Sequence, residues 1–245
     1  MIKKIYRKLK NKLLNHQNLP KHYLNDLNLF RTLDQRKRFE LNNKDLFPCL
    51  NDKTEKTGFD AHYIYHPAWA ARILKQINPK KHIDISSTLH FCSIISAFIP
   101  TEFYDYRPAD LKLSRLMNGK ADLTQLPFKT ATIECISCMH TIEHIGLGRY
   151  GDPIDPDGDI KAILELIRVT KSGGSILFVT PVGKPKIMFN AHRIYDPAMV
   201  IDLFNGCEIK NFALVTDEND FIYDASISDG SLQNYGCGCF WFIKK

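Results

Sequence analysis

The residues best suited to chemistry in this chain of 245 residues lie in one run, from His140 to Asp152. The run combines histidine, glutamate, arginine, tyrosine and aspartate side chains with three glycines, and it directly follows the strand-like segment 133–139. Glycines allow a backbone to approach a ligand closely, and open α/β sheets bind ligands at the carboxyl ends of their parallel strands. The run therefore predicts a ligand site.

A zinc site is one alternative reading of this run. His140, Glu143 and His144 fit the H-x-x-E-H pattern, in which two histidines on one helix face bind zinc and the glutamate activates water. That pattern needs a helix of at least two turns, whereas Gly146 and Gly148 interrupt it at once. We therefore rank zinc hydrolysis as a minor alternative.

Two further groups resemble metal ligands only superficially. Four aspartates between positions 152 and 159 depart from the EF-hand order, so we expect Asp157 or Asp159 to cap the next helix, with Arg149 neutralising a neighbouring acid. Cys237 and Cys239 lack C-x-x-C spacing, and we expect them to pack in an edge strand. We predict no metal ligands.

The elements that position these residues alternate between strand and helix. We expect helices at 60–76, 89–98, 160–169 and 197–204, with Asp60 as the N-cap of the first. Strands are expected at 82–85, 102–106, 133–139 and 175–180, a further short element at 121–123, and two β-rich runs at 207–215 and 239–243. This order predicts an α/β fold with a mostly parallel sheet that ends in an antiparallel pair at the sheet edge.

Composition and charge divide the chain at about residue 58. Hydrophobic residues make up 44% of the sequence, enough for a proper core, and seven scattered cysteines favour a reduced cytoplasmic setting. The net charge of +6 is concentrated in residues 1–44, whose twelve Lys and Arg against three acids leave −3 for the rest. We expect a basic, helical extension and linker at 1–58 and one α/β domain at 59–245.

Residues 1–18 of the extension have the pattern of a basic amphipathic helix. Three roles are open for it: docking on its own domain, peripheral contact with an anionic membrane at the inner membrane face, and nucleic-acid binding. No aromatic interleaving supports the last, so no nucleic-acid partner is expected. The oligomeric state stays open.

The order of elements over residues 60–245 resembles that of the class I S-adenosylmethionine-dependent methyltransferases, which have a Rossmann-like, mostly parallel seven-stranded sheet with a terminal antiparallel hairpin. The resemblance implies S-adenosylmethionine as cofactor, held by Asp84 after the first strand, Asp105 on the ribose and Asp122 on the adenine amino group. Ser86 stands in the turn where the family has glycines. Its Cβ makes a close backbone approach harder.

Three strings resemble a bacterial family of unknown function that is associated with surface-polysaccharide genes. They are 143–152, 155–159 and 189–193. His144 and Glu143 follow the fourth expected strand and His192 follows the fifth, on the ligand side of the sheet, where a methyl acceptor would lie and an imidazole or carboxylate could take a hydroxyl proton. The residues assigned to the acceptor itself are His140, Arg149, Tyr150, Asn190 and Arg193, although Arg193 could instead brace its loop against the acidic run.

We therefore expect methyl transfer to a small or carbohydrate-linked acceptor, with a role in the biosynthesis of a surface polysaccharide. A binding or scaffold protein that has lost catalysis is the alternative from another class. The serines in place of glycines at positions 86 and 87 keep that alternative open.

Overall fold

The computed structural model describes residues 19–245 and divides the chain into two compact units, Met1–Gly58 and Phe59–Lys245. The described part of the first unit contains helix α2 (Lys21–Leu33) and the short 3₁₀ helix η2 (Asn43–Asp45). The amphipathic helix and the membrane contact expected at 1–18 lie outside the described residues. No helix in the described part of the chain is long and apolar enough to cross a membrane.

The second unit is built on one large sheet. Within the described residues this sheet has eight strands, in the order β3-β2-β1-β4-β5-β10-β8-β9. Their bounds are β1 His82–Ile85, β2 Thr101–Asp105, β3 Leu116–Lys120, β4 Ile133–Met139, β5 Thr170–Val182, β8 Cys207–Val215, β9 Phe221–Ile222 and β10 Gly236–Lys244. A separate hairpin joins β6 (Lys186–Met188) to β7 (His192–Ile194).

The expected fold class is confirmed. Strands β3, β2, β1, β4 and β5 are parallel, and β10 runs antiparallel to both β5 and β8. The eighth strand, β9, adds only two residues at the edge. The short element expected at 121–123 is wrong as a strand, because β3 ends at Lys120 and the chain turns there.

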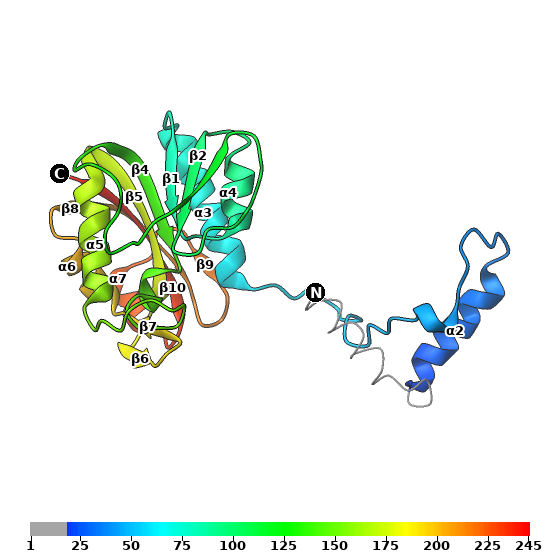
Figure 1. The fold of residues 1–245 in the computed structure, drawn as a ribbon. Helices are drawn as coiled ribbons and strands as arrows, with labels where there is room; N and C mark the ends of the chain where they lie inside the picture. The colour runs from blue at the N-terminus through cyan, green and yellow to red at the C-terminus, as the bar shows by residue number, and fades with distance from the viewer. Residues whose placement is uncertain (1–18) are drawn as a thin grey trace. The chain divides into compact units, whose positions relative to one another are not determined.

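Helices cover both faces of the sheet (Figure 1). On one face lie α3 (Ala61–Ile77) and α4 (Leu89–Ile95), which bury Trp69 against β5, β8 and β10. On the other lie α5 (Gly158–Val169), α6 (Pro197–Leu203) and α7 (Ile227–Ser231), where Phe178 and Phe204 pack edge to face. A sheet buried on both faces explains why its central strands are almost continuously apolar.

Side-chain caps fix where the helices begin. Asp60 accepts a hydrogen bond from the backbone N–H of Tyr63 at the start of α3, as the sequence predicts, and Thr88 accepts one from Phe91 at the start of α4. Asp157 occupies the N-cap position of α5 without a side-chain cap bond. These starts hold the loops that follow the strand ends in place.

Candidate functional site

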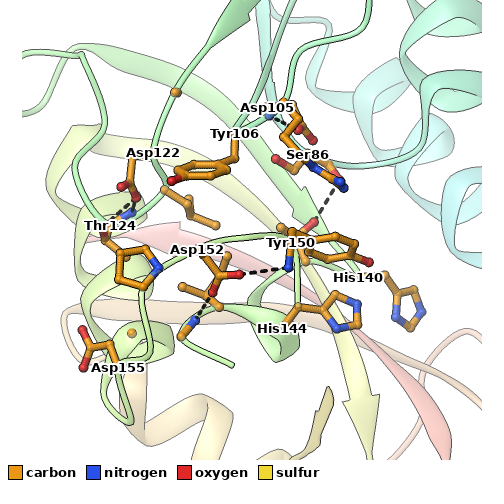
Figure 2. A pocket seen from close by; sticks show the side chains of 18 residues that line it. Ser86, Asp105, Tyr106, Asp122, Thr124, His140, His144, Tyr150, Asp152 and Asp155 are labelled. Carbon is orange, nitrogen blue, oxygen red and sulfur yellow. Dashed lines mark hydrogen bonds between the residues drawn. The ribbon is translucent and has the colours of Figure 1, made fainter. Parts of the chain in front are cut away.

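A cavity of about 260 Å³ opens at the carboxyl ends of β1, β2 and β4. The strand order changes direction here, because β2 and β3 lie on one side of β1 whereas β4 and β5 lie on the other. Open α/β sheets usually bind their ligands at such a point. Figure 2 shows Asp122 and Thr124 on one side of the cavity and His140 and His144 on the other. The sequence-predicted residues that line it are Ser86, Asp105, Asp122, His140, His144 and Tyr150.

Two carboxylates in the cavity wall each keep one oxygen available. Asp105 Oδ1 accepts a 2.6 Å hydrogen bond from the backbone N–H of Arg107, and Asp122 Oδ1 accepts bonds from the N–H and hydroxyl of Thr124 at 2.8 and 2.7 Å. For either Oδ2, the structure of residues 19–245 shows no partner. Both acids can therefore accept hydrogen bonds from a ligand with hydroxyl or amino groups.

The turn after β1 passes along the cavity in a glycine-like conformation. Ser86 has a φ of 57°, in the left-handed region, and its carbonyl accepts a 2.9 Å hydrogen bond from the hydroxyl of Thr141. A non-glycine residue adopts this region at a cost. The serine therefore reproduces the backbone path that a glycine-rich turn would take.

Asp84, which the sequence analysis expects to hold the cofactor, is not among the residues that line the cavity. Its side chain is fully buried and accepts hydrogen bonds from the Ser87 N–H at 3.0 Å and from the Ser137 hydroxyl. Burial raises the pKa of Asp84 to about 6, although these hydrogen bonds lower it. Asp84 thus stabilises the turn after β1 through hydrogen bonds inside the protein.

The same network continues to a second buried group. His82 Nε2 lies 2.8 Å from the Ser137 hydroxyl oxygen, and burial lowers the pKa of His82 to about 3. Because Ser137 donates its proton to Asp84, its oxygen accepts from Nε2–H of a neutral His82. His82, Ser137 and Asp84 thus form one chain of hydrogen bonds under the site.

His144 is the imidazole best placed for proton transfer. Its Nδ1 lies 2.6 Å from the carbonyl oxygen of Ala191, so Nδ1 carries the proton and Nε2 keeps its lone pair. Burial lowers the pKa of His144, which keeps the ring neutral at pH 7. Glu143 Oε1 lies 3.7 Å from Nε2 and can stabilise the positive charge that the ring acquires on protonation.

Glu143 itself is buried behind the cavity, with 1% of its surface exposed. Its Oε1 accepts a 3.0 Å hydrogen bond from His140 Nδ1, whereas Oε2 has no partner among the described residues. His192 lies near His144, with ring centroids 6.4 Å apart, but it is not in the cavity wall. Neither Glu143 nor His192 directly touches the space a ligand would fill.

The loop after η3 (Ile142–His144) is held by Asp152, the last residue of the run that predicts a ligand site. Asp152 accepts hydrogen bonds from the backbone N–H groups of Gly146, Gly148 and Tyr150 at 2.8, 3.3 and 3.1 Å. The Tyr150 ring lies against two guanidinium groups, that of Arg107 at 4.5 Å and that of Arg149 at 5.1 Å. These contacts join the loops after β2 and β4 across the cavity wall.

Arg193 and Asn190 do not have the acceptor-binding positions expected of them. Arg193 is 6% exposed and donates to the carbonyl oxygens of Ile145 and Pro156, with its Nε 3.6 Å from Asp159. It braces the acidic run, because a buried guanidinium needs acceptors around it. Asn190 is exposed in the β6–β7 turn and outside the cavity wall.

Arg149 was expected to neutralise a neighbouring acid, but among the described residues it pairs with none and donates to the carbonyl of Ala191 at 2.9 Å.

The H-x-x-E-H reading is wrong in its geometry: residues 142–144 form a single 3₁₀ turn, and His140 precedes it with a φ of 53°. The two histidines therefore do not share one face of an α-helix.

Several cavity residues were missed by sequence reasoning. They are Tyr106, Arg107 and Thr124, whereas Thr141 and Asp152 belong to the run 140–152 that predicts a ligand site. Tyr106 ends a predicted strand and Arg107 directly follows it, and Thr124 stands two residues after an aspartate, as in a turn closed by an Asx side chain. These positions, next to a strand end or shortly after an aspartate, were the sequence features that could have identified the residues.

Comparisons with known proteins agree with this architecture. The YcgJ protein from Bacillus subtilis has a TM-score of 0.51 at 12% identity, covering 74% of this chain and 98% of that one. The N-methyltransferase NodS from Bradyrhizobium japonicum, solved with S-adenosyl-L-homocysteine, has a TM-score of 0.52 at 12% identity, covering 75% and 87%. The chain therefore has the Rossmann-like fold of the class I S-adenosylmethionine-dependent methyltransferases.

At the level of sequence families, residues 122–228 match a family model described as a Caenorhabditis protein of unknown function, DUF268. The matched span contains the loop after β4 and the β6–β7 hairpin. The bacterial family suggested by the three strings is not confirmed by this match. No curated protein matches the chain.

Proposed function

We propose that this protein transfers a methyl group from S-adenosylmethionine to a hydroxyl of a small or carbohydrate-linked acceptor. The observation that carries the proposal is the pair Asp105 and Asp122, each with an unpartnered oxygen in one cavity at the switch point of the sheet. A methyltransferase fold supports the same conclusion without identifying the acceptor.

The residues present fit this cofactor. Asp105, at the end of β2, would accept hydrogen bonds from the ribose hydroxyls, and Asp122, after β3, would accept one from the adenine amino group. The left-handed turn at Ser86 would carry the backbone past the amino-acid portion. When bound, the cofactor supplies a methyl group already activated by a positively charged sulfur.

The acceptor would lie on the histidine side of the cavity. His144 Nε2, with its free lone pair, would take the hydroxyl proton, and Glu143 would hold the resulting imidazolium. His192 would orient His144 from behind, and His140 and Tyr150 would form the wall against the acceptor.

The polar wall supports a hydroxyl-rich acceptor. Besides the histidines, the cavity lining contains the Thr141 hydroxyl and the Asp152 carboxylate, and Asp155 lies on the side of Asp122 and Thr124 (Figure 2). Groups of this kind bind sugars through several hydrogen bonds. On this basis we propose a carbohydrate-linked substrate and a role in the biosynthesis of a surface polysaccharide.

Isothermal titration calorimetry with S-adenosylmethionine and S-adenosylhomocysteine tests the cofactor. We expect micromolar binding by the wild type, and a loss of at least tenfold in affinity in Asp105→Ala, because ligand hydroxyls lose a charged acceptor. Asp110→Ala, at an exposed acid in the loop after β2, is the matched control and should bind normally.

If the folded wild type binds neither S-adenosylmethionine nor S-adenosylhomocysteine, the proposal is contradicted and the scaffold alternative is favoured. Equal binding by wild type and Asp105→Ala would remove the ribose assignment. If binding is observed, transfer of a labelled methyl group to a panel of sugars and glycan precursors identifies the acceptor.

A further inference from the structure

Three side chains of types that can bind metals come together from distant parts of the chain, beside the histidines that line the cavity. His62 belongs to the first turn of α3, His140 follows β4, and Cys237 lies in β10. One donor atom from each lies within 4.8 Å of the others, and His140 Nε2 is 3.3 Å from Cys237 Sγ. Tetrahedral zinc with ordinary bond lengths places nitrogen and sulfur ligands about 3.6 Å apart. The cluster already has nearly this spacing.

Both imidazoles are oriented as metal ligands are. His140 Nδ1 is held by Glu143 Oε1 at 3.0 Å, and the His62 ring is hydrogen-bonded to the backbone of Tyr235. A histidine that binds a metal through one nitrogen almost always donates its other N–H to a carboxylate or a backbone carbonyl. In His140 the second nitrogen, Nε2, is thus left for the shared space with Cys237.

The cluster is enclosed. The His140 side chain is 4% exposed and Cys237 is fully buried. The His62 ring stacks on His140 and on Tyr235, with centroids 5.5 and 5.2 Å apart, and Tyr63 covers His140 at 5.3 Å. Such packing fixes the rings, which reduces the entropy lost when a metal binds.

The charges around the cluster also balance for a divalent cation. A cation of charge +2 with one thiolate and two neutral imidazoles carries +1, and the Glu143 carboxylate supplies −1 at the contact to His140. Glu143 Oε2 is buried with no partner among residues 19–245, which is unfavourable for an anion without a nearby cation. A bound cation would compensate this buried charge.

We propose that His62, His140 and Cys237 form a site for a divalent cation of the zinc type. The metal forms bonds to one nitrogen of each imidazole and to the sulfur of Cys237, which releases its thiol proton to solvent. A fourth coordination position remains for water or a ligand, as in zinc sites with three protein ligands. The proposal does not depend on methyl transfer, and it departs from the expectation of no metal ligands because no local spacing joins positions 62, 140 and 237.

Metal analysis and cobalt spectroscopy of the full chain test the site. The wild type, stripped with a chelator and then titrated with Co²⁺, should bind one equivalent and develop visible bands of tetrahedral cobalt with a near-ultraviolet thiolate-to-cobalt band. Zn²⁺ should bleach these bands and raise the melting temperature, since a ligand that binds only the native state stabilises it.

Variants separate this site from adventitious binding. Cys237→Ser should lose the thiolate band, and His62→Ala should weaken binding by at least a hundredfold. Glu143→Gln should weaken it ten- to a hundredfold while keeping the band. The matched controls His90→Ala and Cys49→Ser change exposed residues of the same types and should behave as the wild type.

A wild type that binds Co²⁺ without a thiolate band, or does not bind it, overturns the proposal. So does a band that persists in Cys237→Ser. If a variant fails to fold, the wild-type stoichiometry, its thiolate band and the two control variants still decide the question. Calorimetry with S-adenosylhomocysteine on the metal-free protein distinguishes failure of this site from failure of the proposed methyl transfer.

Discussion

The hydrogen-bonded chain from His82 through Ser137 to Asp84 shows how burial sets the charge state of single residues. His82 has no exposed surface, and Ser137 supplies the only hydrogen bond of its imidazole ring within the described chain. The neutral form is therefore strongly favoured in the native protein, whereas the unfolded chain titrates near the ordinary value of 6.5. This difference makes stability depend on pH.

Replacing His82 with glutamine should remove one such dependence. Between pH 6.5 and about 3 the unfolded protein binds a proton at His82 that the native protein does not, so this residue's contribution to wild-type stability is present above pH 6.5 and is lost as the pH falls. The stability advantage of wild type over His82→Gln should shrink by about 2 kcal/mol from pH 7 to pH 5. Urea unfolding at both pH values measures it.

The exposed residue His90 supplies the control for this experiment. His90→Gln should differ from the wild type by the same free energy at pH 7 and pH 5. Parallel stability curves for wild type and His82→Gln would contradict the assignment of a neutral His82.

The sequence predicted which side chains lie in the cavity where a residue's position at a strand end determines the location of its side chain. Asp105 and Asp122 come at or just after strand ends, so the topology alone brings them to the cavity. Asp84 and Arg193 are also charged, but their side chains turn into the protein interior. Burial of this kind depends on partners distant in sequence, such as Ser137 and Pro156, which residue type and spacing do not reveal.

At the scale of elements, periodicity predicted most helices and strands well. The strands at 82–85, 133–139 and 207–215 have the expected bounds. Strand β3 was missed because Asn118 and Gly119 weaken its pattern, and the β6–β7 hairpin because its strands are only three residues long. The position of β10 between β5 and β8 was also missed, because the sequence analysis placed both C-terminal strands at the sheet edge. Strand order is set by pairing across the whole domain.

The turn between β1 and α4 provides a prediction at this scale. Ser86→Gly should raise stability by up to about 1 kcal/mol, because glycine adopts the left-handed conformation without the steric cost of a Cβ. The melting temperature should rise by about 2–4 °C for each kcal/mol gained. Differential scanning calorimetry measures the change, and affinity for S-adenosylmethionine should not fall.

The neighbouring serine in the same turn serves as the control. Ser87 has no left-handed backbone, and its hydroxyl accepts a 3.1 Å hydrogen bond from the Met139 N–H. Ser87→Gly should therefore destabilise the protein by about 1 kcal/mol. A loss of stability in Ser86→Gly would show that the turn is not strained.

At the scale of the whole molecule, the basic extension and the α/β unit should have separable roles. The unit 59–245 has its own core on both faces of the sheet, whereas the excess of positive over negative charge belongs to residues 1–44. We expect the full chain to co-sediment with anionic liposomes and to dissociate at high salt, and a chain lacking residues 1–18 to remain in the supernatant.

Neutral liposomes are the control, and neither chain should sediment with them. If both chains stay in the supernatant with anionic liposomes, the membrane contact is disproved. Binding of S-adenosylhomocysteine should be the same for the two chains, because the cavity is formed entirely within the second unit.

The position of β10 between β5 and β8 has a consequence for how the protein folds. β10 is the last strand along the sequence, yet its neighbours in the sheet are both formed from earlier segments. Until it inserts, β5 and β8 expose unpaired edges rich in apolar side chains, the kind of surface that recruits other chains. This late, long-range closure predicts slow folding and a partly folded intermediate prone to aggregation.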